Sequence, residues 1–170
     1  RVLGIVGLGN IGREVARLAR PFALRILAAA PYVTREQAAA AGAELVPLET
    51  LLRTADFVSV NCALTAETRH LIDAERLALM KPTAFLINTA RGPVVDQRAL
   101  TEALRARRLR GAAIDVFEQE PADPTDPLFA LDNVLVAPHA ICWTDECFRD
   151  NGRSACQSIL DVAADGFPGG

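Results

Sequence analysis

A glycine-rich turn, GLGNIG at residues 7–12, sets the strongest limit on the fold of this chain. It follows an apolar run at residues 2–7, typical of a buried parallel strand, and precedes a segment at residues 10–20 with apolar side chains at helical spacing. In this setting Gly7 permits a tight turn, Gly9 lets the backbone approach a pyrophosphate, and Gly12 allows the helix to pack closely on the strand. A glycine turn without a ligand is the alternative, but the flanking strand and helix favour a dinucleotide site.

Apolar runs and helical patterns alternate along the rest of the chain. Strands are expected at residues 2–7, 24–30, 44–46, 56–61, 84–88, 112–116 and 133–137, and a polar, proline-rich loop at residues 121–132. Helices are expected at residues 10–20, 34–42, 48–54, 73–80, 96–108 and 144–164. Thr34 is expected to begin its helix with Gln37 as capping-box partner and Gly42 to end it, and Asp73 and Thr144 are the expected caps of their helices. The alternation predicts an α/β fold, a Rossmann-type doubly wound parallel sheet of about seven strands with helices on both faces. We expect one dinucleotide-binding domain over residues 1–165, and a linker or cut end at residues 166–170.

Composition limits the partners of the chain. Its 170 residues suffice for one domain with a real core, and its net charge of −3 offers no broad attraction for nucleic acid or an anionic membrane. No run approaches the roughly 20 apolar residues that cross a bilayer, and no signal peptide is expected. The four cysteines, at positions 62, 142, 147 and 156, lack metal-site spacing, so we expect no metal. They lie in apolar or helical surroundings, which predicts buried, reduced thiols in a cytoplasmic protein.

The end of the second predicted strand bears on the choice of cofactor. A NAD site normally places an acidic residue about 20 residues after the glycine turn, where it binds the adenosine ribose. Here Ala30 occupies that position, with Tyr32 shortly after it. Alanine cannot accept those hydrogen bonds, and it also removes the repulsion that would reject a 2′-phosphate. Arg35 is close enough in sequence to pair with such a phosphate, or it is a solvated residue of the first helical turn. The sequence therefore allows either NAD or NADP as the cofactor, and NAD is the first expectation.

Three chemically suggestive residues follow different strands of the predicted sheet. Arg91 comes after the fifth strand, Glu120 after the sixth, and His139 after the seventh. Parallel strands bring their carboxyl ends to one edge, where ligands of such sheets bind. An arginine binds a carboxylate with two hydrogen bonds, a histidine exchanges a hydroxyl proton, and a carboxylate raises the pKa of that histidine. Each residue alone has an ordinary structural explanation. His70 lacks such a setting and is expected at the surface.

Five motifs in order give the chain a resemblance to the D-isomer-specific 2-hydroxyacid dehydrogenase family. They read VLGIVGLGNIG, LTAETRHLI, MKPTAFLINTARGPVVDQRAL, GAAIDVFEQEP and NVLVAPH, and they extend over nearly the whole chain. The resemblance implies that Arg91, Glu120 and His139 are the catalytic residues. Glu118 fits the motif but precedes the catalytic position, because the family's acid lies directly before the proline.

The resemblance also implies a set of cofactor contacts. Asp115 would bind the nicotinamide carboxamide, Thr89 and Ala90 would contact the nicotinamide side, and Asn10 and Ile11 would face the pyrophosphate. Cys62, Ala63 and Thr68 would line the adenosine side. Trp143, four residues after His139, would line the substrate pocket or a subunit contact, or pack against the final helix.

The activity expected from this resemblance is hydride transfer between NAD(P)H and a small 2-oxo or D-2-hydroxy acid, of the glyoxylate or hydroxypyruvate kind. A NAD(H)-sensing regulatory or corepressor-like protein is the alternative, and a scaffold without cofactor affinity, suggested by Ala30, is a third. The family's substrate domain comes from sequence before the glycine turn and from a C-terminal return segment, and neither is found here. We therefore expect weak or no activity from this chain alone, and a cytoplasmic homodimer for the full protein.

Overall fold

The computed structural model describes residues 1–164. The expected linker at residues 166–170 lies outside the described residues. By compactness the chain divides into two units, Arg1–Ala137 and Pro138–Gly170, and each is described by itself. The predicted domain bounds, residues 1–165, stay a prediction.

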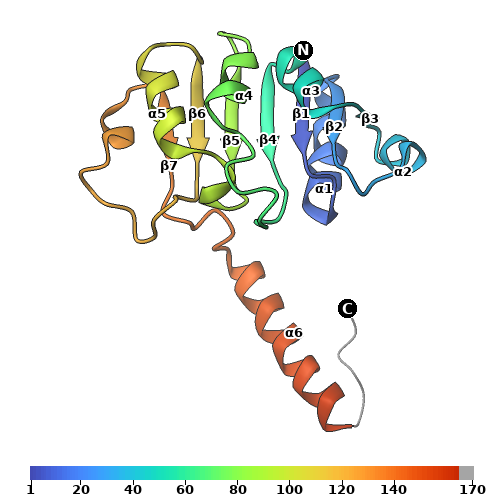
Figure 1. Ribbon diagram of the computed structural model, residues 1–170. Coiled ribbons are helices and arrows are strands. Elements are labelled where there is room, and N and C mark those ends of the chain that lie inside the picture. Colours follow the sequence, from blue (N-terminus) through green and yellow to red (C-terminus); the bar gives the residue numbers. More distant parts are fainter. Residues whose placement is uncertain (165–170) are drawn as a thin grey trace. The chain divides into compact units, whose positions relative to one another are not determined.

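The first unit is built on a seven-stranded parallel sheet (Figure 1). The strand order is β3-β2-β1-β4-β5-β6-β7, so the chain reverses direction across the sheet between β1 and β4. The strands are β1 (Val2–Val6), β2 (Arg25–Ala29), β3 (Glu44–Leu45), β4 (Phe57–Val60), β5 (Phe85–Asn88), β6 (Gly111–Ile114) and β7 (Val134–Val136). This topology confirms the predicted doubly wound fold, whose ligand site lies at the carboxyl ends of β1 and β4.

Helices pack on both faces of the sheet, as predicted. They are α1 (Asn10–Ala19), α2 (Arg35–Ala40), α3 (Leu48–Thr54), α4 (Ala74–Leu79) and α5 (Gln97–Arg105), with short 3-10 turns η1 (Arg20–Phe22), η2 (Gly92–Val94) and η3 (Pro127–Ala130). Strand residues alternate between faces. Val58 and Val60 therefore join the core beneath α3, α4 and α5, and Ile5 joins a second core beneath α1 and α2.

Local signals set most helix boundaries correctly. The Thr34 side chain accepts from the Gln37 backbone N–H and forms the predicted capping box, and Gly42 follows α2 with a φ of +78°. Asp73 caps α4 as predicted. The expected loop at residues 121–132 is wrong in part, because it contains η3, whose first turn is capped by the Asp126 side chain.

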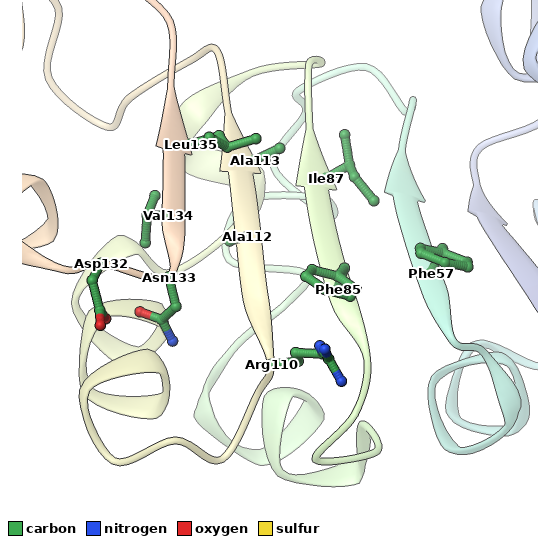
Figure 2. A pocket seen from close by; sticks show the side chains of 10 residues that line it. All are labelled: Phe57, Phe85, Ile87, Arg110, Ala112, Ala113, Asp132, Asn133, Val134 and Leu135. Carbon is green, nitrogen blue, oxygen red and sulfur yellow. The ribbon is translucent and has the colours of Figure 1, made fainter.

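One part of the sheet lacks a helical cover within the first unit. Phe57, Phe85, Ile87 and Leu135 line a pocket of about 530 Å³, and Figure 2 shows them on β4, β5 and β7. All of the lining residues belong to strands or connecting loops, so no helix of the first unit closes this part of the face. The Arg110 guanidinium lies 5.8 Å from the centre of the Phe85 ring.

In its described residues, 138–164, the second unit contains one long helix, α6 (Asp145–Ala163), which Thr144 caps as predicted. The centre of the Trp143 ring lies 6.1 Å from that of Phe148 in α6, and 65% of Trp143 is exposed. The expected contact with the final helix is therefore present, while the roles in a substrate pocket or a subunit contact stay predictions. No described residue of α6 is buried. The prediction of buried thiols is wrong. All four cysteines are free, but Cys142 and Cys156 are exposed and the other two are half-buried. None of the helices in residues 1–164 has the length and apolar character to cross a bilayer.

Candidate dinucleotide and catalytic site

The glycine turn meets the loop after β4 in direct backbone contact. Gly7 has a φ of +91°, a conformation open to glycine, and its N–H donates to the Ala29 carbonyl at 2.9 Å. A Cβ on Gly7 would lie 2.7 Å from both the backbone N and the Cα of Cys62. The tight turn expected of Gly7 is therefore present, and it places Cys62 beside the turn at the carboxyl ends of β1 and β4.

The other two glycines differ in what surrounds them. A Cβ on Gly12 would lie 2.2 Å from the Gly7 carbonyl oxygen, so the protein's own packing requires glycine there. A Cβ on Gly9 would meet no protein atom within 4 Å, and its φ of −78° suits any residue. Nothing in the protein itself therefore demands glycine at position 9, whereas a pyrophosphate approaching the backbone would.

The N-terminus of α1 is suited to an anion. Gly9 is its cap residue and supplies no side-chain hydrogen bond, and the first turn contains no acidic residue. The amides of that turn carry the positive end of the helix dipole. Asn10 and Ile11 are exposed beside them, and the Ile11 side chain is 66% exposed, which is unusual for isoleucine. These residues fit the pyrophosphate of a dinucleotide.

The end of β2, where the adenosine is predicted to bind, lacks the carboxylate that NAD enzymes normally carry. Ala30 is half-buried, and its carbonyl accepts from the Val33 N–H at 3.3 Å. Tyr32 is 94% exposed, and Arg35, at the start of α2, is also exposed. This arrangement does not distinguish NADP from NAD.

The loop after β4 is ordered by hydrogen bonds of threonine side chains. The Thr68 hydroxyl donates to the Ala63 carbonyl at 2.7 Å and accepts from the Thr65 N–H at 2.7 Å. Burial raises the pKa of the Cys62 thiol, which disfavours the thiolate that a nucleophilic cysteine needs.

A buried amide shapes the turn that carries Arg91. The Asn88 side chain, at the end of β5, is almost fully buried. It accepts from the Ala90 N–H at 3.1 Å and donates to the Arg91 carbonyl at 3.1 Å. One guanidinium nitrogen of Arg91 donates to the Ala90 carbonyl at 2.6 Å, while the side chain is exposed at the sheet edge. Thr89 and Ala90 are half-buried within the same turn.

The loop after β6 lies against the Arg91 turn. A Cβ on Gly92 would lie 1.9 Å from the Phe117 carbonyl oxygen and 2.5 Å from the Glu118 nitrogen. The Glu120 carboxylate accepts from the Phe117 N–H at 3.0 Å. Asp115 is buried, and its N–H donates to the Asn88 carbonyl at 3.1 Å. The structure thus brings the segments that carry Arg91, Asp115 and Glu120 together at one edge of the sheet.

His139 belongs to the second unit. It follows β7 closely, is half-buried, and has a φ of +56°, which is uncommon for a residue other than glycine. Its predicted meeting with Arg91 and Glu120 involves both units and stays a prediction. Within residues 1–164, no group of three His, Cys, Asp or Glu side chains is arranged to hold a metal ion.

Sequence reasoning missed a contact between His70 and Glu118. The His70 side chain is 41% exposed, as expected of a surface residue, but its Nε2 pairs with Glu118 Oε1 from the loop after β6. Both residues lie in motifs that the sequence singled out, yet 48 positions separate them. No periodicity or spacing predicts such a meeting. The pocket of Figure 2, in contrast, contains none of the predicted site residues.

The fold, the glycine turn and the polar carboxyl edge define a dinucleotide-binding domain of the Rossmann type. A family model described as D-isomer specific 2-hydroxyacid dehydrogenase, NAD binding domain, matches residues 1–140, and the chain belongs to this family. NAD binding is therefore the property that the matched region contributes to the family.

Relatives and solved structures agree with this assignment. A glyoxylate reductase from Korarchaeum cryptofilum is 53% identical over 160 residues, covering 94% of this chain and 48% of that enzyme. A D-isomer specific 2-hydroxyacid dehydrogenase from Lactobacillus delbrueckii ssp. bulgaricus, solved in its NAD-complexed form, has a TM-score of 0.88 and 27% identity over 98% of this chain and 54% of its own. An acyclic imino acid reductase solved with NADPH and D-Arg has a TM-score of 0.86 and 28% identity, covering 97% of this chain and 52% of its own. The chain spans about half the length of these proteins.

Proposed function

We propose that the protein containing this chain is an oxidoreductase that transfers a hydride between NAD(P)H and a small 2-oxo or D-2-hydroxy acid of the glyoxylate or hydroxypyruvate class. The chain supplies its nucleotide-binding part. The backbone contact between Gly92 and Phe117 is the observation that carries the proposal, because it holds Arg91 beside the segment of Asp115 and Glu120. Membership in the family and the fit of the glycine turn to a dinucleotide support it.

Arg91 is the proposed substrate anchor. A guanidinium has five N–H donors, and the contact with the Ala90 carbonyl engages one of its nitrogens while the side chain stays exposed. The remaining donors match the two oxygens of a substrate carboxylate. This binding would fix the orientation of the neighbouring C2 atom.

Glu120 and His139 are the proposed proton-transfer pair. The nicotinamide, when bound, supplies a hydride to C2 of the oxo acid or accepts one from the hydroxy acid. In the reducing direction protonated His139 gives its proton to the oxygen on C2, so one hydride and one proton convert the C2 carbonyl to the alcohol. A nearby Glu120 carboxylate favours the protonated imidazole and holds its orientation.

The other predicted residues would hold the cofactor. We assign Asp115 to the nicotinamide carboxamide and the glycine turn to the pyrophosphate. Cys62, Ala63 and Thr68 are assigned to the adenosine side, and Thr89 and Ala90 to the nicotinamide side. The cofactor is NAD or NADP. By family resemblance we also propose that the complete protein is a cytoplasmic homodimer. Light scattering tests the dimer, because it measures the molar mass of the complete protein.

A panel of 2-oxo acids, assayed with NADH and with NADPH on the complete protein, tests this function. His139→Ala should abolish most turnover and leave the dissociation constant of NADH unchanged. Cys142→Ser, an exposed change three residues away, is the matched control and should be silent in both measurements. Near-normal rates in His139→Ala would refute the assigned proton donor. If no oxo acid is turned over while NADH binds and alters association with another protein, the regulatory function replaces the enzymatic one.

A further inference from the structure

His70 sits in a backbone conformation that has to be maintained by its surroundings. Its φ is +50°, in the left-handed region that side chains other than glycine rarely adopt. The His70 N–H donates to the Pro93 carbonyl at 2.7 Å, and two residues later the Ile72 N–H donates to the Val94 carbonyl at 3.0 Å. The loop that carries His70 is therefore bound along its backbone to the η2 turn, directly after Arg91.

The imidazole of His70 connects this loop to the segment that carries Glu120. Its Nε2 pairs with the Glu118 carboxylate. On the other side, the Glu118 N–H donates to Gln97 Oε1 at 3.0 Å, and Gln97 Nε2 donates to Asp126 Oδ2 at 2.7 Å. Glu118 is thus held both by its side chain and by its backbone, from two different elements.

Glu118 lies two residues before Glu120, within a segment that is itself closely tied. The Glu120 carboxylate accepts from the Phe117 N–H, and the Phe117 carbonyl packs closely against Gly92. Glu118 lies between Phe117 and Glu120 in the chain, so a shift of Glu118 would disturb the hydrogen bond between them. The loops after β4, β5 and β6 meet at this one point.

Stability alone is a weak explanation of this pair. The His70 and Glu118 side chains are 41% and 34% exposed, and ion pairs at such exposure add little to stability. A positive φ at a residue other than glycine is itself unfavourable. The contact thus adds little to stability and depends on an unfavourable backbone conformation, which favours a positioning role.

We propose that His70 and Glu118 form a positioning pair, which holds the Glu120 segment against the Arg91 turn and so sets the place of Glu120 in the catalytic site. This inference rests on the proposed function of Glu120. His70 itself is not a catalytic residue, because it acts through Glu118.

Kinetics of the complete protein test the role in catalysis. His70→Ala and Glu118→Ala should each lower kcat for the best 2-oxo acid about tenfold, because small displacements of catalytic groups cost that much or more. The dissociation constant of NADH should not change. The double variant should be no worse than either single variant, since both remove the same contact. His70→Gln should recover most of kcat, because its amide N–H can still reach Glu118 and its backbone cost matches that of alanine. Gln119→Ala, an exposed change between the two glutamates, is the control.

Hydrogen exchange of the 170-residue chain tests the pair without any assay of activity. Peptides containing Phe117 and Glu118 should exchange faster in His70→Ala and Glu118→Ala, and at the wild-type rate in Gln119→Ala and His70→Gln. If the protein has no dehydrogenase activity but exchange responds in this way, the proposed function fails and the contact stands. Unchanged exchange in His70→Ala overturns the proposal, even in an active enzyme. Faster exchange with unchanged kcat overturns the positioning role.

Discussion

A Cβ atom on Gly92 would lie 1.9 Å from the carbonyl oxygen of Phe117. This separation is far below any normal contact, so the backbones after β5 and β6 pass each other at a distance that only glycine permits. The relationship matters for the proposed function because Gly92 directly follows Arg91, and the Phe117 N–H donates a hydrogen bond to the Glu120 carboxylate.

Gly92→Ala should therefore destabilise the protein and misplace Arg91. We expect a loss of about 1–3 kcal/mol in the free energy of unfolding, the usual cost of overpacking, measured by urea denaturation. The Michaelis constant for the oxo acid should rise as well. Gly152→Ala, in the middle of α6 where a Cβ meets no atom within 4 Å, is the control and should be neutral or slightly stabilising. A Gly92→Ala protein as stable as the wild type would contradict the close approach.

Gly9→Ala should separate cofactor binding from stability. Since a Cβ at position 9 meets no protein atom, the unfolding free energy should fall by less than about 1 kcal/mol, the cost of a poorer cap residue. NADH affinity, measured by fluorescence titration, should fall at least about tenfold, equivalent to about 1.4 kcal/mol, because the methyl group keeps the pyrophosphate from the backbone. Gly12→Ala should lower both the unfolding free energy and the NADH affinity, since its Cβ would lie 2.2 Å from the Gly7 carbonyl oxygen. Unchanged NADH affinity in Gly9→Ala would place the dinucleotide elsewhere.

Ala30→Asp should shift the preference of the site toward NADH. A carboxylate at the end of β2 accepts hydrogen bonds from the ribose hydroxyls and repels a 2′-phosphate. We expect the ratio of the NADPH to the NADH dissociation constant to rise about tenfold or more, measured by parallel titrations. Arg35→Ala should weaken NADPH alone if that guanidinium binds the phosphate, and should change neither affinity if it is solvated. A ratio unaffected by Ala30→Asp would mean that this position does not face the adenosine ribose.

Asp56 should make the fold sensitive to acid. Hydrogen bonds from the Lys81 side chain at 2.9 Å and from the Val2 N–H at 2.8 Å hold the pKa of its carboxyl below the ordinary 3.8. The unfolded chain therefore takes up the proton more readily than the folded one, and the stabilisation is complete above about pH 4 and is lost as the pH falls through the folded-state pKa. Urea midpoints between pH 2 and 6 should fall less steeply on acidification in Asp56→Asn than in the wild type. Parallel profiles for the two proteins would show that Asp56 contributes nothing to this dependence.

Local patterns in the chain were enough to predict most of the fold. The apolar runs, the capping residue Thr34 and the turn residue Gly42 predicted elements within a few residues of those observed, because each depends on neighbours within one or two turns. The order of strands and helices then led to the doubly wound topology, because crossover connections have one hand and parallel sheets have few arrangements. The same reasoning placed Arg91 and Glu120 on one edge.

Burial was harder to predict than secondary structure. The cysteines of the last helix have apolar neighbours, and that composition suggested buried thiols. In the structure the described residues of α6 have no buried side chain, so Cys156 is exposed. Apolar spacing shows which face of a helix needs a partner, but it contains no information on whether that partner lies in the same unit.

Contacts between distant residues required the folded chain. Gly92 against Phe117 and His70 with Glu118 each join loops from different strands, and both depend on the register of β4, β5 and β6 and on the paths of the loops beyond them. Residue type and periodicity report on a neighbourhood of a few positions along the chain. Which side chains meet at the sheet edge depends instead on how the packed layers align, and that alignment exists only when the whole sheet has formed.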